Sequence, residues 1–160
     1  MNLVLFTSTY PFDGGAEQTF LDPELQHLCH AFEQVTLVPK KIDGRCLPLP
    51  HGVVVDETYA ALLSKANLLS LSLKVFGSKL IYREIFNHPS FIFYPNTLLR
   101  MIRFLAVAKL TSDWTIKWLN QNCLSGRSVF YTYWFDSSTL GIGLAKQRYP
   151  DIRLISRVHG

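Results

Sequence analysis

Residues 2–7 read Asn-Leu-Val-Leu-Phe-Thr, and residues 35–38 read Val-Thr-Leu-Val. Each is a short apolar run that ends where turn residues begin, which is typical of a strand buried on both faces of a parallel sheet. Between the two runs, apolar residues recur at helical spacing. The order strand, helix, strand predicts an α/β domain with a Rossmann-like parallel sheet and helices on both of its faces.

The rest of the chain continues this alternation of strands and helices. β-branched and aromatic residues predict three further strands, at 52–56, 127–134 and 153–158. Helical spacing between Gly and Pro breaks predicts helices near 57–75, 78–87, 96–110 and 111–123, and one more after Asp136. All of residues 1–160 therefore fit one domain.

Local sequence signals predict where two helices start and where one helix packs closely. Asp22 followed by Pro23 predicts the start of the first helix, since Asp caps helices and Pro suits their first position. Asp136 is the expected cap of the helix after the fourth strand. Gly141 and Gly143 lie within that helix, where we expect them to allow close packing on the sheet.

Composition excludes several classes of protein. The chain has 160 residues, of which 48% are hydrophobic and 18% charged, so it is not disordered. Its start has no basic region typical of a signal peptide, and charged residues interrupt its apolar stretches. The three cysteines are odd in number and far apart, which favours a reducing compartment over disulfides or zinc. We therefore expect a cytoplasmic protein.

The loop after the first strand, residues 9–18, carries the paired glycines Gly14 and Gly15. Glycines between a strand and a helix let the backbone approach a ligand, and the helix start favours an anion such as a diphosphate. A tight turn that needs positive φ is the simpler explanation of the pair. The spacing is not that of a dinucleotide fingerprint, and Lys40-Lys41 stands where a ribose-binding acid is expected.

Two groups of residues follow the later strands. His159 comes after the last strand, where a histidine can hydrogen-bond a sugar hydroxyl or transfer a proton. Tyr133, Trp134 and Asp136 follow the fourth strand, and aromatic rings beside a carboxylate suit sugar binding. Core packing of the tyrosine and helix capping by Asp136 are the simpler alternatives. His27 and His30 have the spacing of metal ligands, but the sequence offers no third ligand.

Positive charge is concentrated in the helical segment between Thr58 and Ser112, which has seven basic residues and one acidic residue, Glu84. Arg100 and Arg103 lie opposite the apolar face of the predicted helix 96–110. This arrangement suits contact with anionic lipid headgroups. An ordinary amphipathic helix whose arginines extend into solvent is the alternative.

Three stretches together resemble the N-terminal domain of bacterial family 4 glycosyltransferases of the GT-B fold, of the capsule, exopolysaccharide and O-antigen type. They are Leu-Phe-Thr-Ser-Thr-Tyr-Pro-Phe-Asp-Gly-Gly-Ala-Glu-Gln-Thr-Phe-Leu-Asp-Pro-Glu-Leu (5–25), Tyr-Trp-Phe-Asp-Ser-Ser-Thr-Leu-Gly (133–141) and Ser-Arg-Val-His-Gly (156–160). Each motif is short, but their order along the chain matches the family.

The resemblance implies one half of a two-domain cleft, in which the N-terminal domain binds the acceptor and the C-terminal domain holds a nucleotide sugar. Gly14 and Gly15 match the glycine loop that approaches the donor diphosphate, Glu17 the acid after it, and His159 the histidine near the transferred sugar. The family typically retains anomeric configuration without a metal or other cofactor. The acceptor would be a saccharide, often lipid-linked.

The sequence ends in the loop after its last predicted strand and lacks the donor-binding half, so we expect a truncated domain that is inactive alone. We expect peripheral contact with the inner face of the membrane and no nucleic-acid partner. The alternative is a non-catalytic α/β module that docks to a membrane or a partner. The glycine spacing and Lys40-Lys41 disfavour a nicotinamide-dependent oxidoreductase.

Overall fold

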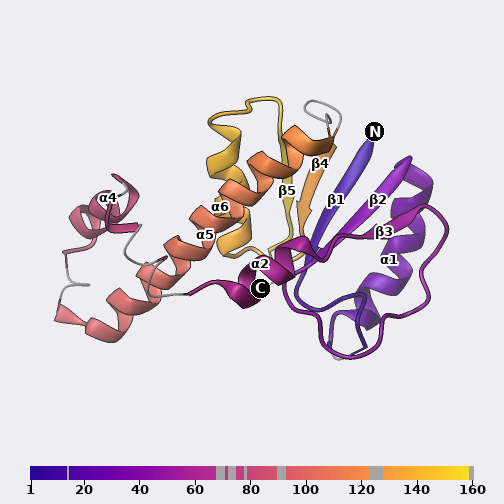
Figure 1. Cartoon of the computed structure of the whole chain (residues 1–160), viewed down its shortest axis with the longest axis horizontal. Helices are drawn as coiled ribbons and strands as arrows, with labels where there is room; N and C mark the ends of the chain where they lie inside the picture. Colours follow the sequence, from indigo (N-terminus) through magenta and orange to yellow (C-terminus); the bar gives the residue numbers. More distant parts are fainter. Residues whose placement is uncertain are drawn as a thin grey trace.

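The computed structural model describes residues 1–13, 15–67, 71, 75–77, 79–89, 93–122 and 128–158, and over these residues five strands form one sheet (Figure 1). The strand order is β3-β2-β1-β4-β5, and every neighbouring pair is parallel. The strands are β1 (Asn2–Thr7), β2 (Gln34–Pro39), β3 (Val53–Val55), β4 (Ser128–Thr132) and β5 (Arg153–Ser156). The predicted α/β class with a Rossmann-like parallel sheet is confirmed.

The central strand β1 shows why its sequence is apolar throughout. Leu3 and Leu5 pack into a core on one face of the sheet, while Val4 and Phe6 pack into a second core on the other face. All four side chains are at most 1% exposed. Successive residues of a strand point to opposite faces, so an unbroken apolar run requires cover on both.

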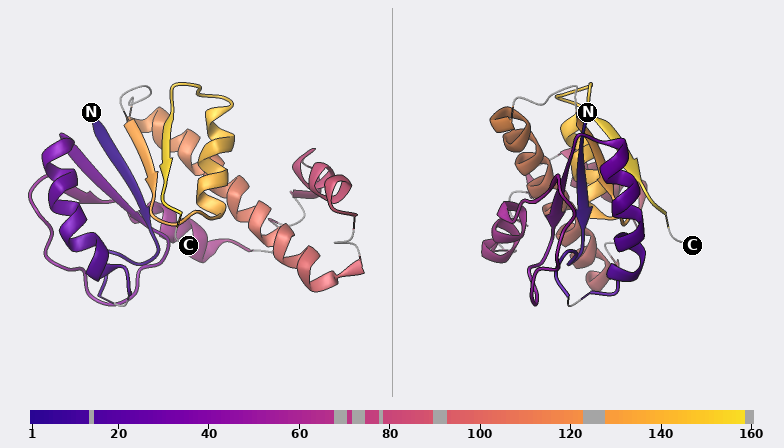
Figure 2. Two further views of the ribbon diagram at one scale, coloured as in Figure 1. Left: turned by 180° about the vertical axis from the view of Figure 1, so that it is seen from behind. Right: turned by 90° about the vertical axis from the view of Figure 1, so that its right-hand side faces the viewer.

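Helices supply that cover on the two faces, as predicted. α1 (Gln18–Ala31) packs Leu21 and Leu25 against one face. On the other face lie α2 (Thr58–Lys65), α5 (Pro95–Asn122) and α6 (Ser137–Lys146), which contribute Tyr59, Trp114, Trp118 and Ile142. Figure 2 shows α1 on one side of the sheet and α2 and α5 on the other.

The predicted start of the first helix is wrong. α1 begins at Gln18, and Pro23 lies inside it. Asp22 is not a cap, because its carboxylate accepts a hydrogen bond from the Tyr10 hydroxyl at 2.9 Å. The helix therefore starts five residues earlier than the Asp-Pro pair indicates, and Asp22 contacts the loop after β1 through Tyr10 instead.

The predicted helices 96–110 and 111–123 are one continuous helix, α5, and the predicted helix 57–75 ends already at Lys65 in α2. The predicted break in α5 falls on Leu110 and Thr111, which are buried against the sheet layer and α6. The Thr111 hydroxyl donates to the Val107 carbonyl at 2.8 Å, so the polar side chain is satisfied within the helix. With no Gly or Pro between Asn96 and Asn122, nothing interrupts the backbone ladder.

The close approach made possible by Gly141 is between two helices rather than between helix and sheet. A Cβ atom on Gly141 would lie 2.5 Å from the Ala108 carbonyl oxygen and 2.5 Å from the Thr111 Cβ of α5. A Cβ on Gly143 would meet no atom within 4 Å. The predicted contact with the sheet is therefore wrong for both glycines, and only Gly141 is at a tight contact.

One part of the chain projects from the body of the domain (Figures 1 and 2). α4 (Lys79–Asn87) packs on the first half of α5 through a small core of Val75, Ile81, Ile102, Leu105 and Ala106. We call the described residues from Val75 to Phe104 the arm. Within the described residues, no helix combines the length and the apolar character needed to cross a bilayer.

Candidate functional site

The strand order creates a switch point at the carboxyl edge of the sheet. From β1 the chain moves to β2 and β3 on one side, and β4 and β5 lie on the other. The loops after β1 and β4 therefore diverge above the centre of the sheet. In open parallel sheets, ligands bind at such a point, so we built the candidate site from these two loops.

Glu17 organises the loop after β1. Its side chain is 4% exposed, and its carboxylate accepts hydrogen bonds from the backbone N–H groups of Ser8 at 2.8 and 2.9 Å, Thr9 at 3.1 Å and Tyr10 at 3.3 Å. A buried carboxylate needs such donors to offset the cost of leaving water. These three amides are thus committed to Glu17, and an anionic ligand at this loop would need other donors.

The same carboxylate joins the loop after β4. The indole N–H of Trp134 donates a hydrogen bond to Glu17, across 117 positions of sequence. The Trp134 ring also meets the Tyr133 ring edge-on, with centroids 5.4 Å apart. Tyr133 itself is fully buried, as its core-packing alternative predicts, and burial raises the pKa of its hydroxyl. One buried acid therefore fixes both loops.

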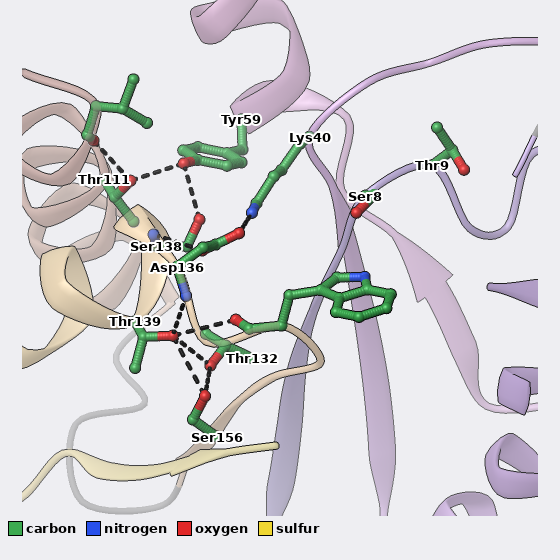
Figure 3. Close-up of polar contacts among 12 residues, drawn as sticks. Ser8, Thr9, Lys40, Tyr59, Thr111, Thr132, Asp136, Ser138, Thr139 and Ser156 are labelled. Atoms are coloured by element: carbon green, nitrogen blue, oxygen red, sulfur yellow. Dashed lines mark hydrogen bonds and ion pairs between the residues drawn. The ribbon is translucent and has the colours of Figure 1, made fainter. Parts of the chain in front are cut away.

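Asp136 caps α6, as the sequence predicts. Its carboxylate accepts from the Ser138 N–H at 2.8 Å, and its own N–H donates to the Thr139 hydroxyl at 3.2 Å, which completes a capping box. The carboxylate also forms an ion pair with Lys40 (Figure 3). Asp136 thus links the ends of β4 and β2 across the carboxyl edge.

Lys40 directly follows β2, where a dinucleotide-binding sheet carries a ribose-binding acid. Burial lowers the pKa of its ammonium group to about 8, and the charge of Glu17 raises it. Contact with Asp136 favours the charged lysine as well, since opposite charges at this separation stabilise each other. The ion pair joins Lys40 to the loop after β4, although the two are far apart in the sequence.

A group of hydroxyls supports the loop from below (Figure 3). Thr132, Thr139 and Ser156 come from β4, α6 and β5, and their side-chain oxygens lie 2.8 to 3.3 Å apart. The Thr139 hydroxyl also reaches the Trp134 carbonyl at 3.2 Å. The backbone that presents residues 134–136 is therefore held by three elements.

Gly15 lies in close contact with a neighbouring side chain. A Cβ at this position would lie 1.8 Å from the Thr9 hydroxyl oxygen. Gly15 is not among the described glycines with positive φ, so a left-handed turn is not the reason for its presence. Gly14 and His159, the other two residues predicted from the glycine loop and the last strand, lie outside the described residues.

Phe135 is the residue at this edge that the sequence analysis missed. Its side chain is 68% exposed, and that of the neighbouring Trp134 is 38% exposed. Glu17 holds Trp134 on one side, and the capping box holds Asp136 on the other. The available signal was the run of three aromatic residues after β4, because β4 ends at Thr132 and the sheet no longer covers the residues that follow it.

A hollow of about 570 Å³ lies beside this edge. It is lined by Lys40, Lys41 and Ile42 after β2 and by Ala60, Ala61, Leu63 and Ser64 of α2. Over the described residues, no group of three or more His, Cys, Asp or Glu side chains is placed to hold a metal ion. Arg100 and Arg103 are exposed on the arm and are not part of this site.

By its fold, the described part of the chain belongs to the class of α/β domains with a five-stranded, Rossmann-like parallel sheet. The loops at the carboxyl edge of this sheet are joined by side-chain hydrogen bonds and an ion pair. Comparison with protein-family models, curated proteins and solved structures found no match. Chemically, the edge offers an exposed aromatic pair beside an ion pair. Such a surface can stack on the apolar face of a sugar ring and hydrogen-bond its hydroxyls.

Proposed function

We propose that the chain is the acceptor-side domain of a retaining glycosyltransferase that moves a sugar from a nucleotide sugar to a saccharide acceptor. The observation that carries the proposal is the joining of the glycine loop and the aromatic loop by Glu17 at the switch point. The resemblance of residues 5–25, 133–141 and 156–160 to family 4 glycosyltransferases supports the same conclusion. No metal or other cofactor is invoked.

In this proposal Phe135 and Trp134 form a platform for one sugar ring. An exposed aromatic side chain costs little further ordering on binding when its backbone is already fixed, and the neighbours of Phe135 are both anchored. The ion pair of Lys40 and Asp136 lies next to the platform and supplies groups for sugar hydroxyls. The resemblance assigns contacts with the donor to His159 and the glycine loop, and most of the donor binding to a second domain.

The test is nucleotide release by the protein that the complete reading frame encodes. UDP- and GDP-sugars are offered with a detergent-solubilised membrane extract as the source of acceptor. We expect release from one donor, and a loss of kcat/KM in Phe135→Ala and in His159→Ala. The loss in Phe135→Ala should be up to about tenfold, which is what stacking on one aromatic ring is worth.

Val54→Ala is the control, because Val54 is an exposed apolar side chain (48%) on the edge strand β3 and belongs neither to the carboxyl edge nor to the arm. It should release nucleotide at the rate of the unchanged protein. The proposal fails if a folded protein releases nucleotide from no donor. It also fails if Phe135→Ala and His159→Ala match the control.

A second candidate function is a non-catalytic α/β module that docks to a membrane or partner. The arm favours it, because its aromatic side chains are exposed away from the sheet. Release of nucleotide that depends on Phe135 would exclude a purely non-catalytic module. Docking of the arm without any nucleotide release would support it.

A further inference from the structure

The arm exposes many large apolar side chains that are not part of its core. Tyr82, Phe86, Phe93 and Tyr94 are 62%, 87%, 81% and 63% exposed. Phe76, Leu99 and Phe104 are exposed by 42 to 45%. Single exposed apolar residues are ordinary, but many large ones on one projecting segment indicate an interaction surface.

The helices of the arm each have an outer face of this kind. On α4, Ile81 and Ile85 pack toward α5, whereas Tyr82 and Phe86, also four residues apart, form a neighbouring stripe that remains exposed. The exposed stripe of Tyr82 and Phe86 is therefore separate from the contact that packs α4 on α5. It is available to a partner without unpacking the helix.

On α5 the outer face combines apolar and basic side chains. Leu99 and Phe104 are exposed there, with Arg100 and Arg103 between them in sequence. Ile102 and Leu105 on the opposite side are buried against α4. A helix face that mixes Leu, Phe and Arg is typical of helices that lie in the interface of a bilayer.

The charge of the arm selects the partner. Arg83, Arg100 and Arg103 are all exposed, and the one acid of the surrounding segment, Glu84, forms an ion pair with Arg83 at 3.7 Å. A second copy of this surface would bring arginines against arginines, which opposes self-association. An anionic surface with an apolar layer beneath it complements both the charge and the aromatic side chains.

We propose that the arm docks the domain on a bilayer surface that contains anionic lipids. The aromatic side chains of α4 and of Phe93 and Tyr94 enter the boundary between headgroups and acyl chains, and the arginines contact lipid phosphates. Arginine suits this position because its aliphatic stem packs on apolar surface while its guanidinium binds phosphate. The inference does not depend on sugar transfer.

The test is co-sedimentation of the chain with vesicles of phosphatidylcholine alone or with one quarter phosphatidylglycerol. We expect binding to the anionic vesicles that is at least about tenfold tighter than to the neutral ones. Arg100→Gln/Arg103→Gln should lose about thirtyfold of that affinity, since each base near the surface contributes about fivefold. Phe86→Ala/Phe93→Ala should weaken binding to both kinds of vesicle.

Lys146→Gln/Arg148→Gln is the matched control, because it removes the same charge from exposed positions in and after α6, away from the arm. It should bind anionic vesicles more tightly than the arginine variant. Equal losses in both charge variants would reduce the effect to net charge and overturn the proposal. Equal binding to neutral and anionic vesicles would also overturn the proposal. The same holds if sedimentation velocity shows a concentration-dependent dimer that Phe86→Ala/Phe93→Ala abolishes.

Discussion

The indole N–H of Trp134 and the buried carboxylate of Glu17 form a hydrogen bond that joins the loops after β1 and β4. Glu17→Gln keeps the size of the side chain but replaces one acceptor oxygen by an amide that cannot accept. At least one of the four N–H groups around it loses its partner. We expect a loss of about 1–3 kcal/mol in the free energy of unfolding, measured by urea denaturation.

Glu57→Gln provides the control for this prediction. Glu57 precedes α2, is exposed, and makes no side-chain capping hydrogen bond. Its substitution should change the free energy of unfolding by less than about 0.5 kcal/mol. Equal stability of the two variants would mean that the carboxylate of Glu17 is not what orders the loops.

The sheet could be predicted from the sequence because its signals are local. The apolar run of β1 is buried on both faces as its composition indicates, and Asp136 caps α6 through residues only two and three positions away. The start of α1 could not be predicted in this way. Asp22 is engaged by Tyr10, 12 positions earlier, and no local pattern reveals that contact.

Two glycines of α6 should respond oppositely to the same substitution. Gly141→Ala places a methyl group 2.5 Å from the backbone of α5, which must shift, at a cost of about 1–3 kcal/mol. Gly143→Ala meets no atom within 4 Å and should stabilise the helix by about 0.5–1 kcal/mol. Thermal unfolding of the two variants checks the signs. A fall in stability at both positions would contradict the packing described.

The contact of Thr9 with Gly15 predicts coupling between them. Gly15→Ala alone should destabilise the domain, because its Cβ would lie 1.8 Å from the Thr9 hydroxyl oxygen. In a Thr9→Ala background that oxygen is gone and only the Thr9 Cβ, at 3.2 Å, remains close. A double-mutant cycle from urea unfolding should give a coupling of about 0.5–3 kcal/mol. Strictly additive effects would show that Thr9 turns away freely.

The candidate site was only partly predictable, for a related physical reason. Trp134 and Asp136 were identified by residue type after a strand, and Glu17 by the resemblance alone, but what each one contacts depends on strand order. Lys40 meets Asp136 across 96 positions, and the two come together because β2 and β4 flank β1 in the sheet. Phe135 differs from its aromatic neighbours in being the most exposed of the three. A run of three aromatic residues does not indicate which of them is exposed.

Tyr131 predicts a loss of stability at alkaline pH. Burial raises the pKa of its hydroxyl to about 12, assisted by the hydrogen bond to Glu24 at 2.9 Å. An unfolded tyrosine ionises near pH 10. The contribution of Tyr131 to the free energy of unfolding is therefore complete below pH 10 and disappears between about pH 10 and 12. The free energy of unfolding should therefore fall less from pH 9 to 11 in Tyr131→Phe than in the unchanged protein. Tyr82→Phe, at an exposed position, should leave the fall unaltered, and equal slopes in all three proteins would refute the assignment.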